Sequence, residues 1–489
     1  MKPVAGSLKL GLMTGLLGLS LTLAGCGDSG GKSNADLRVI HASKDAPLVD
    51  IRVNNRTVIA ELDYAESSGY VEVRSGTKSV VVEAIIPGGN LDVITVPALQ
   101  LEENQRYNIL AVNDTATIEA QVVAESASEP SISEVAIAVV HASTNAGAVD
   151  VYVTAPGALL NGSAPTFTIE YQGVIDAGAI PAGEYQIRIA LQGEANPDAN
   201  AVYDSGTIDL NGFAGQKLLI AAISSVTDTE LATSPVKLLV ATDQTSLVLL
   251  DTTTSIGARV THLSPDAGPV DVFANGGKLI SDLEYSETFP SGTLAAAMDP
   301  GYSDYANVAP GDYSFDVVAP ASPMSTVAGS VYNAMLSLDS GIDYSVVALG
   351  NVGDGLNGPG NGTAFGLLPM VDVNRPVVTQ ASVKILHAAP LAGLVDVYVT
   401  PAGDFTTLEV EAGLAGDPLL DGFAFGTLTD YVPVPPGSYD IRVVPELSGV
   451  TAIDVPGFML DAGLVATVIA RQPDGDGNPA DFNLVVLTN

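Results

Sequence analysis

The chain repeats one stretch of sequence four times: VIHASKDAPLVDIRV from Val39 to Val53, VVHASTNAGAVDVYV from Val139 to Val153, VTHLSPDAGPVDVFA from Val260 to Ala274 and ILHAAPLAGLVDVYV from Ile385 to Val399. All four histidines of the protein lie in these stretches, and each precedes an aspartate by nine positions, in the pairs His41/Asp50, His141/Asp150, His262/Asp271 and His387/Asp396. Successive histidines are about 100 to 125 residues apart, which is the length of an independent domain. The sequence therefore predicts four tandem domains.

Each copy of the motif has the alternation of two strands joined by a tight turn. In the first copy, Val39 and His41 share the face of a strand that is expected to meet the core. In the next strand, residues 49–53 alternate apolar with polar side chains, so Asp50 points away from the core. Since the two side chains then occupy opposite faces, the spacing does not favour a His/Asp catalytic dyad.

The rest of each repeat predicts seven or eight short strands per unit. Hydrophobic residues make up 47% of the chain and charged residues 15%, which excludes a disordered polyelectrolyte, and 50 glycines and 30 prolines supply turns. We expect an all-β protein of four tandem antiparallel, immunoglobulin-like β-sandwiches. Their predicted bounds are residues 36–126, 134–251, 257–374 and 382–489. Because the linkers are short, we expect an elongated rod of domains rather than loose beads.

The N-terminal segment, residues 1–25, is typical of an export signal, with two lysines before an apolar run from Leu10 to Leu23 that is short for a membrane helix. It ends in Leu23-Ala24-Gly25-Cys26, which resembles the lipobox of bacterial lipoproteins, and Cys26 is the only cysteine. The resemblance implies an acylated Cys26 that anchors the chain in a membrane, with residues 26–35 as a tether. Gly27 follows the cysteine and favours the outer membrane.

The motif also resembles the domain-of-unknown-function family 4397, whose usual wording is close to V-x-H-A-S-P-D-A-P-x-V-D-V-Y. The first and third copies keep most of this pattern, whereas the second has Thr144 and Asn145, and the fourth has Ala389 and Leu391, at positions where the family has other residues. The resemblance implies exported bacterial β-sandwich modules and carries no established activity. A catalytic role for the loop aspartate could not operate in the second or fourth domain.

For the motif residues we expect a structural role, with each histidine at the edge of the core and one ring nitrogen bonded to a backbone carbonyl or a turn residue. A loop that forms one edge of a ligand site, and general-base catalysis, remain as alternatives. A weak calcium loop is suggested by Asp474, Asp476 and Asn478, which alternate in a glycine-rich segment, although a plain hairpin loop has the same composition. No other cofactor is expected.

The formal charge of −37 argues against nucleic acid and against an anionic membrane surface as partners. Apart from the membrane that holds the lipid on Cys26, we expect a protein or polysaccharide partner. These observations favour a non-enzymatic lipoprotein of the cell envelope that serves adhesion or scaffolding. The alternative is a surface or periplasmic lipoprotein that binds carbohydrate or peptide through loops at the ends of the sandwiches.

Overall fold

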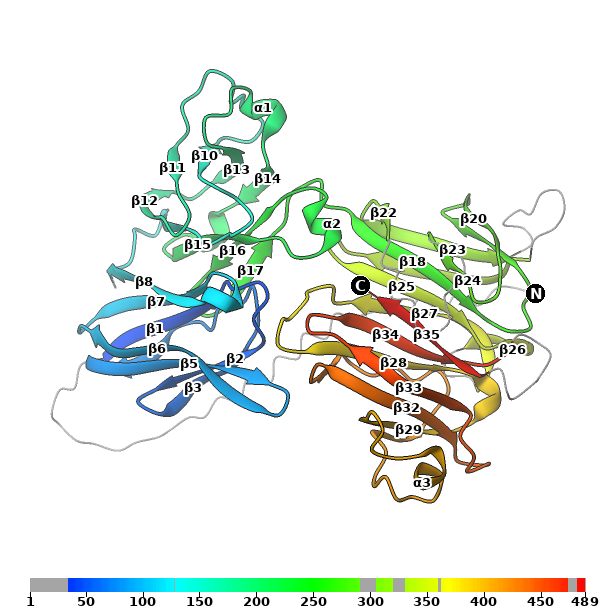
Figure 1. Ribbon diagram of the computed structural model, residues 1–489. Helices are drawn as coiled ribbons and strands as arrows, with labels where there is room; N and C mark the ends of the chain where they lie inside the picture. Colours follow the sequence, from blue (N-terminus) through cyan, green and yellow to red (C-terminus); the bar gives the residue numbers. More distant parts are fainter. Residues whose placement is uncertain are drawn as a thin grey trace.

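The computed structural model describes residues 34–126, 128–290, 305–319, 330–358, 362–473 and 482–488. Its chain forms four β-sandwiches, which confirms the all-β prediction (Figure 1). Helical turns are short: α1 (Pro197–Asn200), α2 (Asp228–Leu231), α3 (Thr407–Glu411) and the 3-10 turns η1 (Thr115–Thr117), η2 (Asn211–Phe213) and η4 (Pro390–Ala392). Within the described ranges, no helix has the length and hydrophobicity needed to cross a bilayer.

Each domain has two sheets, which we name after the motif residue they carry. In domain 1 the histidine sheet has the order β4-β1-β7-β8, with β1 (Asn34–His41), β4 (Val71–Arg74), β7 (Gln105–Val112) and β8 (Glu119–Ser126). The aspartate sheet has the order β3-β2-β5-β6, with β2 (Val49–Val53), β3 (Arg56–Leu62), β5 (Gly76–Ile86) and β6 (Gly89–Leu101). One pair departs from the antiparallel prediction, because β1 runs parallel to β7.

Domain 2 repeats this plan with an extra edge strand. Its histidine sheet has the order β12-β9-β15-β16-β17, with β9 (Glu134–His141), β12 (Val174–Pro181), β15 (Lys217–Ser224), β16 (Val236–Ala241) and β17 (Ser246–Leu249). Its aspartate sheet has the order β11-β10-β13-β14, with β10 (Val149–Thr154), β11 (Phe167–Ile169), β13 (Glu184–Leu191) and β14 (Tyr203–Asp209). The strands β9 and β15 are parallel, as in domain 1.

Domains 3 and 4 follow the same plan. The domain 3 sheets are β21-β18-β25-β27-β26, with β22 beside β18, and β20-β19-β23-β24; the strands are β18 (Ile256–Leu263), β19 (Val270–Ala274), β20 (Gly277–Leu283), β21 (Thr288–Phe289), β22 (Ala306–Val308), β23 (Gly311–Val318), β24 (Ser330–Leu338), β25 (Asp343–Leu349), β26 (Asn351–Gly358) and β27 (Ala364–Asp372). The domain 4 sheets are β31-β28-β34-β35 and β30-β29-β32-β33; the strands are β28 (Ala381–Ala388), β29 (Val395–Pro401), β30 (Leu420–Phe423), β31 (Val432–Val434), β32 (Gly437–Pro445), β33 (Ile453–Leu460), β34 (Val465–Arg471) and β35 (Asn483–Thr488).

The histidine sheets are buried on both faces. One face of each meets the core of its own sandwich, where the side chains at alternate strand positions, such as Val39 and Ile109, are fully buried. The opposite faces of domains 1 and 2 form a second apolar cluster that includes Ile40, Leu110 and Leu219. A matching cluster joins domains 3 and 4. The domains therefore pack as two face-to-face pairs.

Buried cations close one end of each of these interfaces. Arg259, three positions before the motif histidine, reaches across the interface and donates from Nη1 to the Thr488 carbonyl at 2.9 Å. Its Nη2 lies 3.3 Å from the Asp372 carboxylate, and Tyr305 lies under its guanidinium at 4.6 Å. Arg38 occupies the same position in domain 1 and donates to the carbonyl of Thr242 in domain 2.

The contacts between paired domains are reciprocal. In the pair of domains 3 and 4, Lys384 of domain 4 donates to the Val371 carbonyl of domain 3 at 2.5 Å, which mirrors the contact that Arg259 makes in the opposite direction. In the pair of domains 1 and 2, Tyr64 donates to the Ser224 carbonyl, and Tyr171 donates to the Asn113 side chain. Each pair thus has a local pseudo-two-fold arrangement.

The two pairs also touch each other. Arg375, in the linker between domains 3 and 4, donates to the Ala46 carbonyl at 2.7 Å and forms an ion pair with Asp63 of domain 1. In Figure 1 the four domains lie as two pairs side by side. The expected elongated rod is therefore wrong, because the outer faces of the histidine sheets are apolar and are buried against each other instead of facing water.

We predict that replacing Arg259 by alanine lowers the free energy of unfolding of domains 3 and 4 by about 3–5 kcal/mol, because the substitution leaves the buried Asp372 carboxylate without its cation. Urea denaturation of the full chain measures the change. The matched control is Arg56→Ala on the exposed surface of β3, which should alter stability by no more than about 0.5 kcal/mol. Equal effects of the two substitutions would contradict the structural role of Arg259.

Candidate functional site

The motif histidine makes the same hydrogen bond in all four domains. Its Nε2 lies 2.8–3.0 Å from the carbonyl oxygen of the residue six positions later, namely Pro47, Gly147, Gly268 or Gly393. Because a carbonyl can only accept, Nε2 carries the proton. In domains 2 to 4, Nδ1 accepts the backbone N–H two positions after the histidine, at 3.2–3.4 Å. The ring is therefore a neutral imidazole that pins the loop between the two sheets.

Burial keeps these imidazoles neutral. Desolvation lowers the pKa of each of the four histidines, and it lowers the pKa of His41 to about 4. His41 differs from the others in that its buried Nδ1 has no hydrogen-bond partner among the described residues. An aromatic ring packs edge-on against each histidine, such as Tyr64 against His41 and Tyr285 against His262. The same tyrosines donate hydrogen bonds to the paired domain, so the motif histidines pack against side chains that form the interface.

The motif aspartate holds a bulge in the neighbouring strand. Asp50 and Asp271 accept the backbone N–H groups of Glu61 and Asp282 at 2.9 Å, and both of these donors have positive φ angles. In domain 4, Asp396 accepts from Gly422, whose φ is also positive. Asp150 of domain 2 instead accepts from a threonine hydroxyl and from the backbone of Gly193. Each carboxylate thus satisfies backbone groups of its own domain.

The structure does not bring the motif histidine and aspartate together. They lie in different sheets of each sandwich, and within the described ranges no hydrogen bond joins the two residues of any pair. The loop aspartate of the motif also bonds to backbone: Asp45 accepts from Thr115 at 2.7 Å, and Asp266 accepts from Val352 at 2.7 Å. The motif residues therefore stabilise their own domains through hydrogen bonds, and their side chains do not converge on a common site.

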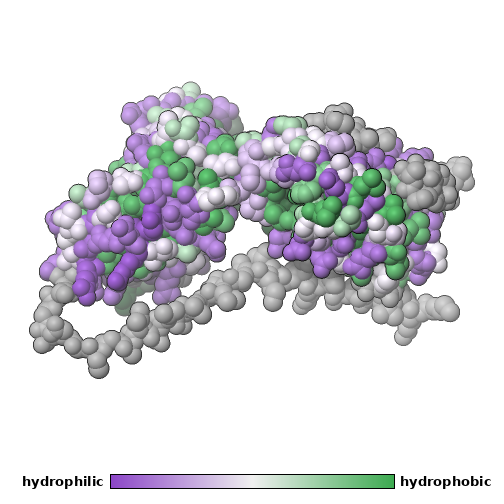
Figure 2. Space-filling model, turned by 60° about the horizontal axis from the view of Figure 1, so that its bottom comes forward, coloured by the Kyte–Doolittle hydropathy of each residue, from purple (hydrophilic) through white to green (hydrophobic). Residues whose placement is uncertain are grey.

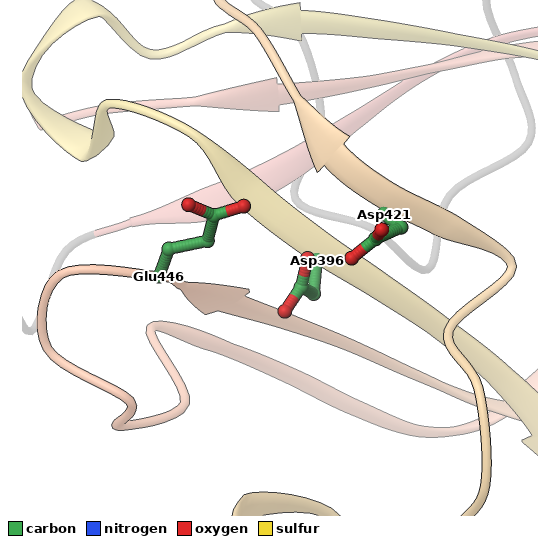
Figure 3. Close-up of side chains that lie close together, drawn as sticks. All are labelled: Asp396, Asp421 and Glu446. Atoms are coloured by element: carbon green, nitrogen blue, oxygen red, sulfur yellow. The ribbon is translucent and has the colours of Figure 1, made fainter.

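One acidic cluster was not predicted from the sequence. Asp396, Asp421 and Glu446 of domain 4 have carboxylate oxygens within 4.8 Å of one another, and Figure 3 shows their side chains converging. Oxygen ligands of this kind suit a hard cation such as calcium. Two of the three side chains are exposed, and Asp396 already accepts the Gly422 amide. The three residues are far apart in the sequence, so no local spacing indicated the cluster.

The other predicted site residues cannot be placed in the fold. Cys26 lies outside the described residues, and so does the suggested calcium loop with Asp474, Asp476 and Asn478. Both therefore stay predictions from the sequence. The acidic cluster in domain 4 is separate from that loop and shares only Asp396 with the motif.

Domain 2 has a hollow core. A cavity of about 510 Å³ lies between its two sheets, whereas the corresponding spaces in domains 3 and 4 measure about 110 and 40 Å³. The walls are mainly valine, leucine and isoleucine side chains. At roughly 24 cal/mol per Å³, a closed empty void of this size would cost on the order of 10 kcal/mol, which is comparable to the whole stability of a domain.

We predict that the buried His41 makes stability depend on pH. Its pKa is about 4 in the folded chain against 6.5 for the free side chain, so between these values the unfolded chain binds more protons. This contribution is complete above pH 6.5 and is lost as the pH falls toward 4. A His41→Gln variant lacks this contribution at every pH. The difference in free energy of unfolding between the unmodified chain and the variant should therefore shrink by roughly 3 kcal/mol as the pH falls from 6.5 to 4. Urea denaturation at several pH values measures the gap, and a gap that stays constant would contradict the assignment.

Comparison with known proteins gives two weak structural similarities and one family match. Two solved structures show some similarity. One is described as "Alpha-glucan recognition by family 41 carbohydrate-binding modules from streptococcal virulence factors", with 12% identity, a TM-score of 0.14, and coverage of 47% of this chain and 100% of that chain. The other, "Product complex of a multi-modular glycogen-degrading pneumococcal virulence factor SpuA", has 11% identity, a TM-score of 0.15, and coverage of 58% and 36%. Scores this low support no functional conclusion.

No curated protein matches the chain in sequence. The family described as "Domain of unknown function (DUF4397)" matches residues 35–152 and 256–398, which together make up more than half of the chain. Each match starts in the first strand of an odd-numbered domain and ends in the second strand of the next domain. The chain therefore belongs to the domain-of-unknown-function family 4397.

Proposed function

We propose that the protein is a non-enzymatic, lipid-anchored component of the cell envelope whose four packed sandwiches form a platform for adhesion or envelope scaffolding. The observation that carries this proposal is that the repeated polar residues form hydrogen bonds within their own domains. In every domain, Nε2 of the motif histidine and at least one oxygen of the motif aspartate bond to backbone groups of the same domain. General-base catalysis would require one of these groups to be within reach of a substrate proton.

The packing of the domains supports a mechanical role. Each histidine sheet buries both of its faces, and the linker residue Arg375 ties the second pair of domains to the first. A chain held in this way keeps the surfaces of its four domains at fixed distances from one another, which suits spacing or display. The large negative charge of the chain favours partners that are neutral or cationic over anionic polymers.

The anchor is the part of the proposal that rests on sequence. We predict that Cys26→Ser releases the protein from membranes, because the substitution removes the only thiol that can carry the acyl chains. Detergent phase partition and cell fractionation measure the change. Gly25→Ala is the matched control, since it keeps the cysteine and replaces one small residue by another. Continued membrane retention of the Cys26→Ser chain would show that a different anchor exists.

The side of the membrane on which the domains lie tests the adhesion role. Intact cells that make the protein are treated with a protease, and the region from Asp36 to Asn489 is followed by immunoblotting. Adhesion predicts that this region is digested on intact cells. Protection until the outer membrane is opened would contradict adhesion and leave envelope scaffolding as the function. A periplasmic marker protein, which must survive the first treatment, is the control.

The alternative is a peptide-binding function at the end of domain 4. Leu391 and Leu447 are 62% and 95% exposed there, and Leu447 directly follows Glu446 of the acidic cluster. The backbone N–H of Glu446 donates to the Leu394 carbonyl, which holds this loop against the motif loop. Hydrophobic patches also interrupt the hydrophilic surface in Figure 2. Exposed leucines beside carboxylates favour a basic peptide over a carbohydrate, since the chain has no tryptophan to stack on a sugar. Saturable binding of such a peptide would favour this alternative.

A further inference from the structure

We infer that domain 2 binds one neutral aliphatic molecule inside its sandwich, in the cavity between the histidine sheet and the aspartate sheet. The cavity of about 510 Å³ falls within the range of small-molecule sites in proteins. It is formed by both sheets of a single domain, and the interface with domain 1 lies on the other face of the histidine sheet. The inference concerns a site that is distinct from the proposed platform function and does not depend on it.

Three inner side chains of domain 2 are more exposed than their counterparts in domain 1. Val139, Val153 and Ile187 lie on the inner faces of the two sheets and are only half-buried. The strand registers align them with Val39, Val53 and Val80 of domain 1, which are 0%, 6% and 1% exposed. The same strand positions therefore enclose a filled core in one domain and line a cavity in the other.

Two substitutions between the repeats account for part of this difference. The pairing of β10 with β13, and of β19 with β23, places Ile187 of domain 2 at the position of Phe315 in domain 3. The pairing of the parallel strands likewise places Leu218 at the position of Tyr344. All four residues line the space between the sheets of their domains. The aromatic rings of domain 3 thus fill part of the volume that domain 2 leaves open.

The walls select an uncharged ligand that needs few hydrogen bonds. The Thr166 and Ser205 hydroxyls already accept the backbone N–H groups of Val153 and Ile187, at 2.9 Å each. The His141 ring, which also lines the cavity, is bonded through both nitrogens and has a lowered pKa. An aliphatic chain suits these surfaces because it gains from leaving water and demands no polar partner.

The rim of the cavity disfavours anions. Thr207 and Asp209 of β14 border the cavity and are exposed, so the cavity reaches solvent along this edge strand. The carboxylate of Asp209 would repel a fatty acid headgroup, and the net charge of −37 adds to this effect. Between two ligands of equal chain length, the structure therefore favours the alcohol over the carboxylate.

The test uses the chain from Gly27 to Asn489, which carries no acyl group of its own, and the neutral fluorescent probe N-phenyl-1-naphthylamine. We expect saturable binding of one probe per chain. We also expect that 1-dodecanol displaces the probe and that dodecanoate does so at least about tenfold less effectively. Absence of saturable binding would overturn the inference, and equal displacement by dodecanoate would overturn the assigned neutral class.

Variants locate the site. Ile187→Phe places the domain 3 residue in the cavity and should weaken probe binding by about tenfold or more while the melting temperature stays the same or rises. Leu218→Phe, on the opposite sheet, should act in the same way and provides a second measurement if one variant folds poorly. Val248→Phe adds the same ring on the exposed face of β17 and should leave binding unchanged. Unchanged binding in folded Ile187→Phe and Leu218→Phe chains would place the probe elsewhere and overturn the inference.

Discussion

The structure depends on the burial of both faces of the histidine sheets. An antiparallel sandwich sheet can leave one face in water, but strands that are apolar on both sides require cover on each. In domain 1 the cover on the inner face is the aspartate sheet, and on the outer face it is domain 2, through Ile40, Leu110 and Leu219. Neither domain of a pair can expose this face without a cost in hydrophobic free energy, so the unit of stability is the pair.

The buried cations make the pairs specific as well as stable. Burial lowers the pKa of Arg38, and a buried guanidinium is tolerated only where hydrogen bonds and counter-charges replace its hydration. Arg38 meets this requirement with hydrogen bonds to Asn108 and to the Thr242 carbonyl of domain 2, and with the Glu125 carboxylate at 3.6 Å as its counter-charge. The reciprocal position in domain 2 is Ala138, whereas domain 4 has Lys384 there. The two interfaces are therefore built on one plan but are not interchangeable.

The sequence allowed the prediction of the all-β fold because the alternation around each motif has a period of two and recurs four times. It did not allow the prediction of the pairs, although a signal was present. The runs Ile109–Val112 and Leu218–Ala222 are continuously apolar instead of alternating, which is typical of strands buried on both faces. Arg38 favoured the opposite interpretation, because an arginine on the outer face of a strand is typical of a face in contact with water rather than with a partner domain. The acidic cluster of Asp396 with Asp421 and Glu446 could not be predicted, because its members meet only through the sheet fold.

The motif that defines the family is the part of the chain that says least about function. His262 holds its loop as the other three motif histidines do, and Asp271 accepts from a bulge as Asp50 and Asp396 do. Asp150 also bonds within its own domain. A feature that does the same work in four domains cannot explain why the domains differ. The differences lie elsewhere, in the hollow core around Ile187 and in the acidic, leucine-rich end of domain 4. Selectivity for a partner or ligand therefore has to arise from the segments between the motifs, and the hydrogen bonds of the motif residues hold these segments in place.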